Sequence, residues 1–420
     1  MPTPQPESPV RKKSQWLMAL AYIVAIALGI ATGLWGTETL QSLAHFISSI
    51  FIRLFKFISI PIIAVSIIAT LARISRSSGS GRIFRHTIFY TLFTTLLAAS
   101  LAAVLFVLYA PANVAVSHAK SLSQITEHSY FDYIQTVVPD NFLAPFLSAN
   151  VLSVLLVAAA VGLAISKLPR NSRSQTVLLD FFTGAQEVLF ILVGWLIKVL
   201  PLGIFGFITE LVVEMTQGVE LGGLGTYFAT ILTANFVQML VILPLILLVR
   251  GLNPLKVFKA MGPALAVAFF SKSSAGTLPV TMSCAENNLG VKRPIARFVL
   301  PICTTINMNG CAAFILVTVV YLMQNAGATI SPSTLLAWIF VSTIAAVGNA
   351  GVPMGCFFLS ASLLASMNVP ILLMGVILPF YAVIDMIETT LNVWSDSCVA
   401  TLVNKDLKDE TFDESVEQAS

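Results

Sequence analysis

The sequence predicts an all-α polytopic membrane protein with eight transmembrane helices, two re-entrant helical hairpins and an inverted internal repeat. Of the 420 residues, 57% are hydrophobic and only 10% are charged, which indicates a multi-pass membrane protein rather than a soluble one. Apolar stretches of about 20 residues or more, the length needed to cross a bilayer, recur along the chain. The net charge of +3 is too small to favour nucleic-acid binding.

The first element is an apolar run from about Trp16 to Trp35, preceded by the basic residues Arg11, Lys12 and Lys13. It is too long for the apolar region of a signal peptide and lacks a small-residue cleavage pattern, so we expect a retained helix with a cytoplasmic N-terminus. Short cytoplasmic tails, 1–14 and the acidic 404–420, are expected to be disordered. The eight predicted spans are 15–36, 43–73, 83–110, 147–166, 175–215, 223–249, 294–323 and 372–403.

Two further segments, 255–286 and 334–366, each consist of two short apolar halves separated by small residues. The interruptions are SSAG at 273–276 and GNAGVP at 348–353. Paired interrupted segments are typical of broken helices around a binding site. The positive-inside rule orients the first segment to enter from the cytoplasm and the second from outside, so their tips can meet near the midplane. The cytoplasmic basic loop residues are Arg73, Arg76, Arg82, Arg85, Lys167, Arg170, Arg173, Arg250, Lys256, Lys259, Lys292 and Arg293.

No charged side chain lies between Arg297 and Asp385, and then Asp385, Glu388 and Asp396 occur within one apolar segment. A charge at the centre of a spanning helix costs roughly 2.5–3.5 kcal/mol on insertion scales, so these carboxylates indicate function. With Asn392, they line one helical face with oxygen atoms, which favours a cation. The alternative is a helix-end cluster that reaches cytoplasmic water.

The five cysteines have neither a CxxC pair nor metal-site spacing, so we expect packing thiols and no disulfide. They are Cys284, Cys303, Cys311, Cys356 and Cys398.

Four motifs in order resemble those of the dicarboxylate/amino acid:cation symporters, the glutamate-transporter family. SSAGTLP at 273–279 and AGVP at 350–353 resemble its two hairpin tips. NMNG at 307–310 resembles its NMDGT motif, and DMIETTLN at 385–392 resembles its last binding helix. The match extends over nearly the whole chain outside the two tails.

The resemblance implies a secondary active symporter for an amino acid. Asp385 matches the family's partner for the substrate ammonium, and Asn392 with the backbone N–H of Ser274 matches its carboxylate clamp, where a broken-helix tip attracts an anion. A solvated turn is the alternative explanation of the serine-rich tip. The further substrate residues implied are Ser273, Cys311, Val352, Glu388 and Thr389.

Glu388 departs from the acidic-substrate members, which carry an arginine at this position. A glutamate there repels a second substrate carboxylate. The pattern DxxETxLN resembles that of the serine/threonine symporter branch, so we expect a small neutral amino acid such as serine, threonine or alanine. The alternatives are a sodium- or proton-coupled glutamate/aspartate symporter and a cationic amino acid transporter. An ion pair between Glu388 and Lys272 is an equally weighted explanation of this carboxylate.

Sodium is the implied coupling ion, and no other cofactor is expected. One implied site combines Asp396 and Asn392 with carbonyls near Cys303 and Asn307, and a second uses carbonyls of Thr305, Ala346, Val347 and Asn349. The third site of the family corresponds here to Thr91, Thr94, Thr95 and Asn309. Because Asn309 replaces an aspartate, we expect fewer coupled cations. Thr94 and Thr95 could instead bond to their own helix.

The resemblance also implies a homotrimer in a bacterial-type inner membrane with both termini cytoplasmic. Residues 15–73 and 147–215 would form the scaffold, and 83–110 and 223–403 the mobile transport domain of an elevator mechanism. Lys272 and Gly276 mark the first hairpin tip, while Gly351 and Pro353 mark the gate.

An enzyme is not expected. The GxGD setting of intramembrane aspartyl proteases is absent, and Asp385 and Asp396 share one helix. The SSAGT sequence is not a GxSxG elbow, and no histidine lies in the C-terminal half. A channel remains the other alternative to a symporter, and solute accumulation against a gradient separates the two.

Overall fold

The fold comes from a computed structural model that describes residues 9–73, 81–114, 138–147, 151–169, 172–216, 222–349, 351, 353–367 and 369–408. These residues are helical or irregular, and no strand occurs among them. This agrees with the predicted all-α class. Ala350, Val352 and most of the acidic tail, 409–420, lie outside the described residues.

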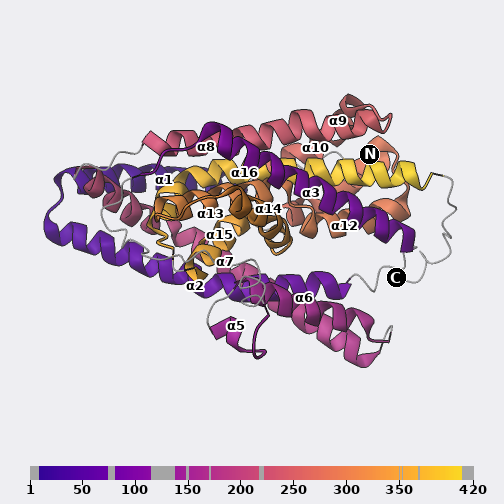
Figure 1. Cartoon of the computed structure of the whole chain (residues 1–420), viewed down its shortest axis with the longest axis horizontal. Coiled ribbons are helices and arrows are strands. Elements are labelled where there is room, and N and C mark those ends of the chain that lie inside the picture. Colours follow the sequence, from indigo (N-terminus) through magenta and orange to yellow (C-terminus); the bar gives the residue numbers. More distant parts are fainter. Residues whose placement is uncertain are drawn as a thin grey trace.

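Four helices of the N-terminal half pack mainly on one another. They are α1 (Pro9–Trp35), α2 (Glu38–Arg73), α6 (Val151–Lys167) and α7 (Arg173–Thr216). The short α5 (Ala144–Leu147) precedes α6 and contacts it. α7 contacts both α1 and α2, and α6 lies along α2. In Figure 1, α2, α6 and α7 lie together on one side of the molecule.

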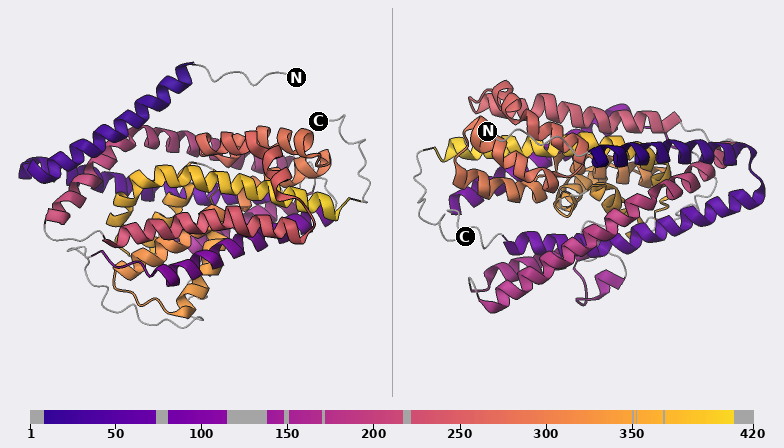
Figure 2. Two further views of the ribbon diagram at one scale, coloured as in Figure 1. Left: turned by 90° about the horizontal axis from the view of Figure 1, so that it is seen from above. Right: turned by 180° about the vertical axis from the view of Figure 1, so that it is seen from behind.

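The remaining helices form a second group. They are α3 (Gly81–Tyr109), α8 (Gly222–Val237), η2 (Gln238–Ile242), α9 (Leu243–Val249), α10 (Pro254–Ser271), α11 (Ser274–Ser283), η3 (Cys284–Leu289), α12 (Arg293–Ile306), α13 (Asn309–Asn325), α14 (Pro332–Val347), α15 (Gly355–Ser366) and α16 (Leu372–Asp406). α16 contacts α10, α12 and α13, and α13 also packs against α3, α14 and α15. Figure 2 shows α16, in yellow, running within this group. The two groups touch mainly where α15 meets α2 and α16 meets α7, and α15 also contacts α6.

Both interrupted segments begin and break at residues that favour helix termini. Asn253 caps α10 by accepting from the N–H groups of Leu255 and Lys256 at 3.0 and 3.2 Å, and Pro254 occupies the first helical position. Ser331 caps α14 in the same way, ahead of Pro332. α10 ends at Ser271, before Lys272 adopts a left-handed conformation with φ of 55°. α11 and η3 then fold back on α10, where Asn288 donates to the Ala260 carbonyl.

The predicted span 294–323 is not one continuous helix. It divides into α12 and α13 at Asn307 and Met308, whose backbones are not helical. Asn307 is fully buried, and its side chain bonds to α3 and α16 instead of pointing toward lipid. The hydropathy of the segment could not reveal this break because its apolar residues continue on both sides.

The chain ends also differ from expectation. α1 begins at Pro9 rather than near residue 15, because proline is well suited to the first turn of a helix. α16 continues to Asp406, within the expected tail. The Asp406 carboxylate accepts a hydrogen bond of 2.7 Å from Tyr90 and pairs with Arg250, while Lys292 donates to the Lys408 carbonyl at 2.6 Å. These contacts hold the end of α16 against α3 and α9.

Five helices in the described part of the chain are long and apolar enough to cross a membrane. They are Gly81–Tyr109, Arg173–Leu196, Gly223–Val249, Arg293–Asn325 (across its break) and Leu372–Asp406. Shorter apolar helices occur at Leu20–Trp35, Ile60–Ala69, Leu156–Lys167, Pro332–Val347 and Gly355–Ser366. The last two belong to the second interrupted segment and its flanks.

Candidate substrate and cation site

The tips of the two interrupted segments meet. The Ser273 hydroxyl donates to the Gly351 carbonyl at 3.1 Å, and the Ala275 N–H donates to the same oxygen at 3.3 Å. Gly351 has a φ of +64°, and a Cβ there would lie 2.6 Å from the Thr304 carbonyl. Only glycine can adopt this left-handed backbone and also leave room for the Thr304 carbonyl without strain. The second tip therefore lies against the end of α12 as well as the first tip.

Ser273 also caps α11, accepting from the Gly276 N–H at 3.0 Å. Ser274 is the first residue of α11 and is 3% exposed. Its N–H belongs to the first helical turn, whose donors have no partner within the helix. This buried helix N-terminus is suited to an anion such as a carboxylate.

Asp385 lies on the buried face of α16 beneath the second tip. One of its oxygens, Oδ2, accepts a hydrogen bond of 3.1 Å from the Met354 N–H, just before α15. The carboxylate is thus joined directly to the second interrupted segment.

Glu388 lies one turn further along α16 and is 1% exposed. Its Oε2 accepts from the Tyr381 hydroxyl at 3.1 Å, while Oε1 has no hydrogen-bond partner. The alternative ion pair between Glu388 and Lys272 is not formed. Gly310 makes room for this helix, because a Cβ on Gly310 would lie 2.8 Å from the Glu388 Cα.

Asn392, the next polar position on the same face, bonds to the start of α13. Its Oδ1 accepts from the Gly310 N–H at 2.9 Å, and its amide nitrogen lies 3.5 Å from the Cys311 Sγ. Thr389 is buried beside it. Most of the predicted substrate residues therefore lie together between α13, α16 and the hairpin tips, namely Asp385, Glu388, Thr389, Asn392 and Cys311. Val352 lies outside the described residues.

The expectation of no disulfide is wrong for one pair. Cys311 and Cys356 are joined, with their Cα atoms 5.4 Å apart, although 45 positions separate them in sequence. They lie at the starts of α13 and α15, which pack together, and no spacing rule could have linked them. Cys284, Cys303 and Cys398 are buried free thiols, as expected.

The residues of the first predicted sodium site are close together. The Asp396 Oδ1 accepts from the Asn307 amide at 2.9 Å, and the Cys303 carbonyl accepts from the Asn307 N–H at 2.8 Å. Asn392 lies one turn earlier on α16. This cluster provides one carboxylate together with amide and carbonyl oxygens, which suits a hard cation.

The residues of the second predicted sodium site lie at helix C-termini. Thr305 is in the last turn of α12, and Ala346 and Val347 end α14, which contacts α12. Asn349 follows this turn, and its Oδ1 is buried without a partner. The Ala346 carbonyl already accepts from the Asn349 N–H at 3.1 Å. The negative ends of two helix dipoles still favour a cation where they approach.

At the third predicted site, the side-chain amide of Asn309 points into a group of oxygens. Its Nδ2 lies 2.9 Å from Ser395 Oγ, 3.0 Å from Asn307 Oδ1 and 3.4 Å from Thr94 Oγ1. Thr94 also bonds to the Tyr90 carbonyl of its own helix, the alternative role foreseen for it. Thr91 contacts the Cys303 sulfur at 3.6 Å, and the buried Thr95 hydroxyl has no partner.

Gln238 fixes the orientation of the Asn309 amide. Its Nε2 donates to the Thr94 carbonyl at 3.1 Å and to the Asn309 Oδ1 at 2.8 Å. Since a carbonyl only accepts, Gln238 must present its NH₂ group here, and Asn309 must then turn its own NH₂ toward the other oxygens. The neutral amide of Asn309 therefore occupies the position between the oxygens of Ser395, Asn307 and Thr94.

Sequence reasoning missed four members of this site, namely Gln238, Met354, Tyr381 and Ser395. Gln238 begins η2, a wide helical turn of the kind that often marks functional sites, but its sequence gives no sign of it. Met354 acts through its backbone, so its side chain is uninformative. Ser395 adjoins Asp396, and Tyr381 lies seven positions before Glu388 on the same helical face, so both could have been found from spacing.

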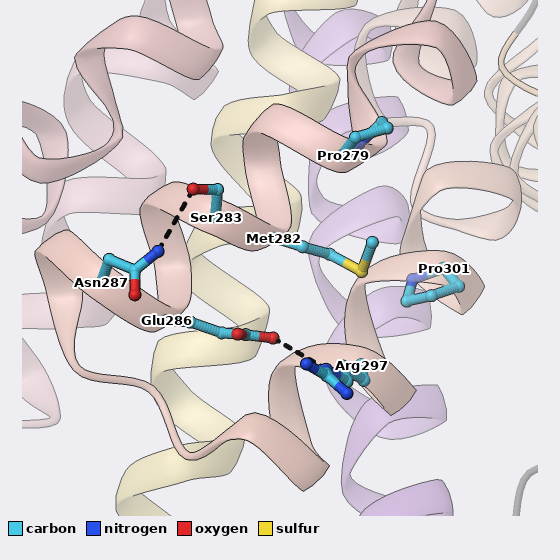
Figure 3. Close-up of a pocket in the computed structure, with 7 residues that line it drawn as sticks. All are labelled: Pro279, Met282, Ser283, Glu286, Asn287, Arg297 and Pro301. Atoms are coloured by element: carbon cyan, nitrogen blue, oxygen red, sulfur yellow. Dashed lines mark hydrogen bonds and ion pairs between the residues drawn. The ribbon is translucent and has the colours of Figure 1, made fainter. Parts of the chain in front are cut away.

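A separate pocket of about 580 Å³ lies outside this cluster (Figure 3). Glu286 and Arg297 form an ion pair across it at 3.2 Å. Its other lining residues are Pro279, Met282, Ser283, Asn287 and Pro301. None of the predicted substrate or cation residues contributes to its walls.

The chain that carries these residues is similar to known amino acid transporters. The chain is 28% identical to the human "Neutral amino acid transporter B(0)", over 92% of this chain and 80% of that protein. It is 28% identical to the human "Excitatory amino acid transporter 3" over 94% of this chain and 86% of the relative. Identity to the bovine "Neutral amino acid transporter A" is 27%, over 94% and 82%.

The profile of the "Sodium:dicarboxylate symporter family" matches residues 18–406. This range includes both interrupted segments, the α12–α13 break and the acidic face of α16, and it confirms the resemblance found in the motifs. The chain belongs to the sodium:dicarboxylate symporter family.

Proposed function

We propose that this protein is a sodium-coupled symporter that imports a small neutral amino acid, with serine, threonine and alanine as first candidates. The family's description names dicarboxylates, whereas two of the three relatives described above are neutral amino acid transporters. Family membership alone therefore leaves the substrate class open. The residues of this chain's own site favour the neutral class.

The buried carboxylate of Glu388 carries the substrate assignment. Asp385 takes the ammonium group, and the Ser274 N–H with the Asn392 amide takes the carboxylate. A substrate side chain then extends toward Glu388, whose free Oε1 can accept a hydrogen bond from a hydroxyl. Two like charges 4 Å apart repel by about 4 kcal/mol at an effective dielectric constant of about 20, which disfavours aspartate and glutamate.

Transport proceeds by movement of one helix group against the other. The proposed scaffold consists of α1, α2, α6 and α7, and the proposed transport domain contains α3 and α8–α16. This division is supported by contacts that are extensive within each group and restricted mainly to α15–α2 and α16–α7 between them. The protein would have eight membrane spans and two re-entrant hairpins, assemble as a homotrimer, and keep both termini on the cytoplasmic side of an inner membrane.

The second hairpin acts as the gate. Its tip contacts the first tip, the end of α12 and Asp385, so sodium at the helix ends and substrate at Asp385 both favour the closed position. Each positive charge that moves inward gains about 2.3 kcal/mol per 100 mV of membrane potential, which provides the driving force.

Fewer cations are coupled here than in relatives with an aspartate at the position of Asn309. The amide of Asn309 already donates to the oxygens that would surround a third cation. A sodium ion there would have to displace this donor and would have no carboxylate of its own.

The test is uptake of labelled serine by proteoliposomes under an inward sodium gradient, with unlabelled threonine, alanine, aspartate and arginine as competitors. Sodium-dependent accumulation that threonine suppresses and aspartate does not would support the proposal. Equal competition by aspartate would favour the acidic-substrate alternative. Equilibration without accumulation would indicate a channel.

A further inference from the structure

Two cysteines and a glutamate meet on three different helices at the centre of the site. The sulfurs of Cys311 and Cys356 and a carboxylate oxygen of Glu388 all lie within 4.8 Å of one another, and all three residues are buried. Cys311 belongs to α13, Cys356 to α15 and Glu388 to α16. Amino acid binding requires no pair of thiols, so the proposed function assigns no role to Cys356 or to its pairing with Cys311.

We propose that the reduced Cys311–Cys356 pair, together with Glu388, binds one thiophilic divalent cation such as Zn²⁺ or Cd²⁺ and thereby fixes the second hairpin in place. Two thiolates and a carboxylate are a ligand set that these metals favour. Ligand atoms around a tetrahedral Zn²⁺ lie about 2.0–2.3 Å from the metal. The three ligand atoms already lie within 4.8 Å of one another, and opening the disulfide frees both sulfurs for the metal.

Two further observations point to a ligand here. The Glu388 Oε1 is buried without a hydrogen-bond partner and lies on the side chain that completes the cluster. The Asn349 and Asn392 amides lie 2.9 and 3.5 Å from the Cys311 Sγ. Two N–H donors around one sulfur suit a thiolate, the form that binds metal.

The disulfide and the metal complex exclude each other. Opening the Cys311–Cys356 bond takes two electrons from a thiol or phosphine reductant and two protons, and it yields two thiols. A thiol reductant becomes a disulfide, and a phosphine becomes its oxide with an oxygen atom from water, which also supplies the protons. The cation then replaces both thiol protons, which are released to solvent. The disulfide links α15 to α13 alone, whereas a metal bound in this way links α15 to both α13 and α16, so the gate cannot move.

The test uses the full-length protein, purified and reduced with a phosphine that competes weakly for metal. Thiol titration first counts the free cysteines, and Cd²⁺ is then added while the ultraviolet thiolate-to-cadmium absorption is followed. We expect one ion per chain, with at least a tenfold loss of affinity in Cys311→Ser, Cys356→Ser and Glu388→Gln. Cys284→Ser, which changes a buried free thiol outside the cluster, is the matched control and should bind as the parent does.

Thermal unfolding without metal checks that each variant is folded. The proposal is overturned if the reduced parent shows no absorption band, if Cys356→Ser binds as tightly as the parent, or if Cys284→Ser loses the band equally.

A second arm measures serine uptake by the reduced protein with and without Cd²⁺, followed by a chelator. We expect the ion to stop uptake by the parent reversibly and to have little effect on Cys356→Ser. Metal binding without any serine uptake would sink the proposed function and leave the metal site standing. Normal serine uptake with no cadmium band would overturn the metal site and leave the proposed function standing.

Discussion

The backbone N–H of Met354 donates a hydrogen bond of 3.1 Å to the carboxylate of Asp385. The group proposed to bind the substrate ammonium therefore also holds the start of α15, the inner half of the second interrupted segment. The Asp385 carboxylate is therefore the acceptor both for the substrate ammonium and for the backbone of the gate. This gives the substrate a direct influence on the hairpin without a relay through other residues.

Asp385→Asn should weaken serine binding by about 10-fold to about 150-fold, because a hydrogen bond to a charged group contributes roughly 1.5–3 kcal/mol. The asparagine keeps a carbonyl oxygen that can still accept from Met354, so the hairpin contact survives. The measurement is the serine concentration that half-saturates sodium-driven uptake.

Thr390→Ala serves as the control for Asp385→Asn. Thr390 lies on the same helix but bonds only to the Met386 carbonyl one turn back, at 2.8 Å. Its removal should leave serine affinity within about twofold of the parent value. A similar loss in both variants would mean that disturbance of α16, and not the charge of Asp385, explains the effect.

Glu388→Arg should convert the preference from serine toward aspartate. The arginine replaces a repelling carboxylate by a group that pairs with one, and a gain of about 1.4 kcal/mol corresponds to a tenfold change in the competition constant. Glu388→Gln should remove the repulsion alone and give an intermediate result. Unchanged selectivity in both variants would show that the substrate side chain does not approach this position.

Asn309→Asp should raise the number of sodium ions coupled to each substrate. The carboxylate supplies the missing counter-charge, and Gln238 can still donate to it as it donates to the Asn309 carbonyl oxygen at 2.8 Å. The measurement is the membrane potential at which net serine flux stops in proteoliposomes with fixed gradients. An unchanged potential would contradict the view that the Asn309 amide occupies a cation position.

Gly351→Ala should impair closure of the gate. The left-handed backbone costs a non-glycine residue roughly 1–2 kcal/mol, and the new Cβ also meets the Thr304 carbonyl. We expect serine affinity to fall by about fivefold to thirtyfold, together with a smaller rise in melting temperature on adding sodium and serine. Gly225→Ala, where a Cβ meets nothing within 4 Å, should leave both measurements unchanged.

Hydropathy and motif order allowed much of the site to be predicted. Asp385, Glu388, Asn392 and Asp396 had to share one face because the helical period dictates it, and α16 is one continuous helix. The contact between Ser273 and Gly351 agrees with the expectation that the two tips meet.

Other features depend on tertiary distances or on backbone groups, which a single sequence does not encode. The Cys311–Cys356 pair arises because α13 and α15 pack together, not because of any spacing between the residues. The Met354 contact uses an N–H that every residue except proline possesses. The break at Asn307 follows from what its side chain bonds to, and apolar neighbours conceal it.

The secured end of α16 has a practical consequence for protein engineering. Tyr90 and Arg250 bind Asp406, and Lys292 donates to the Leu407 and Lys408 carbonyls, so this turn connects α16 to α3, to the end of α9 and to the start of α12. An affinity handle or fluorescent reporter attached beyond Lys408 leaves these contacts unchanged. A chain shortened to end before Asp406 loses the contacts of α16 with Tyr90 and Arg250. Its melting temperature should therefore be lower than that of the full chain, which can be measured before any uptake assay.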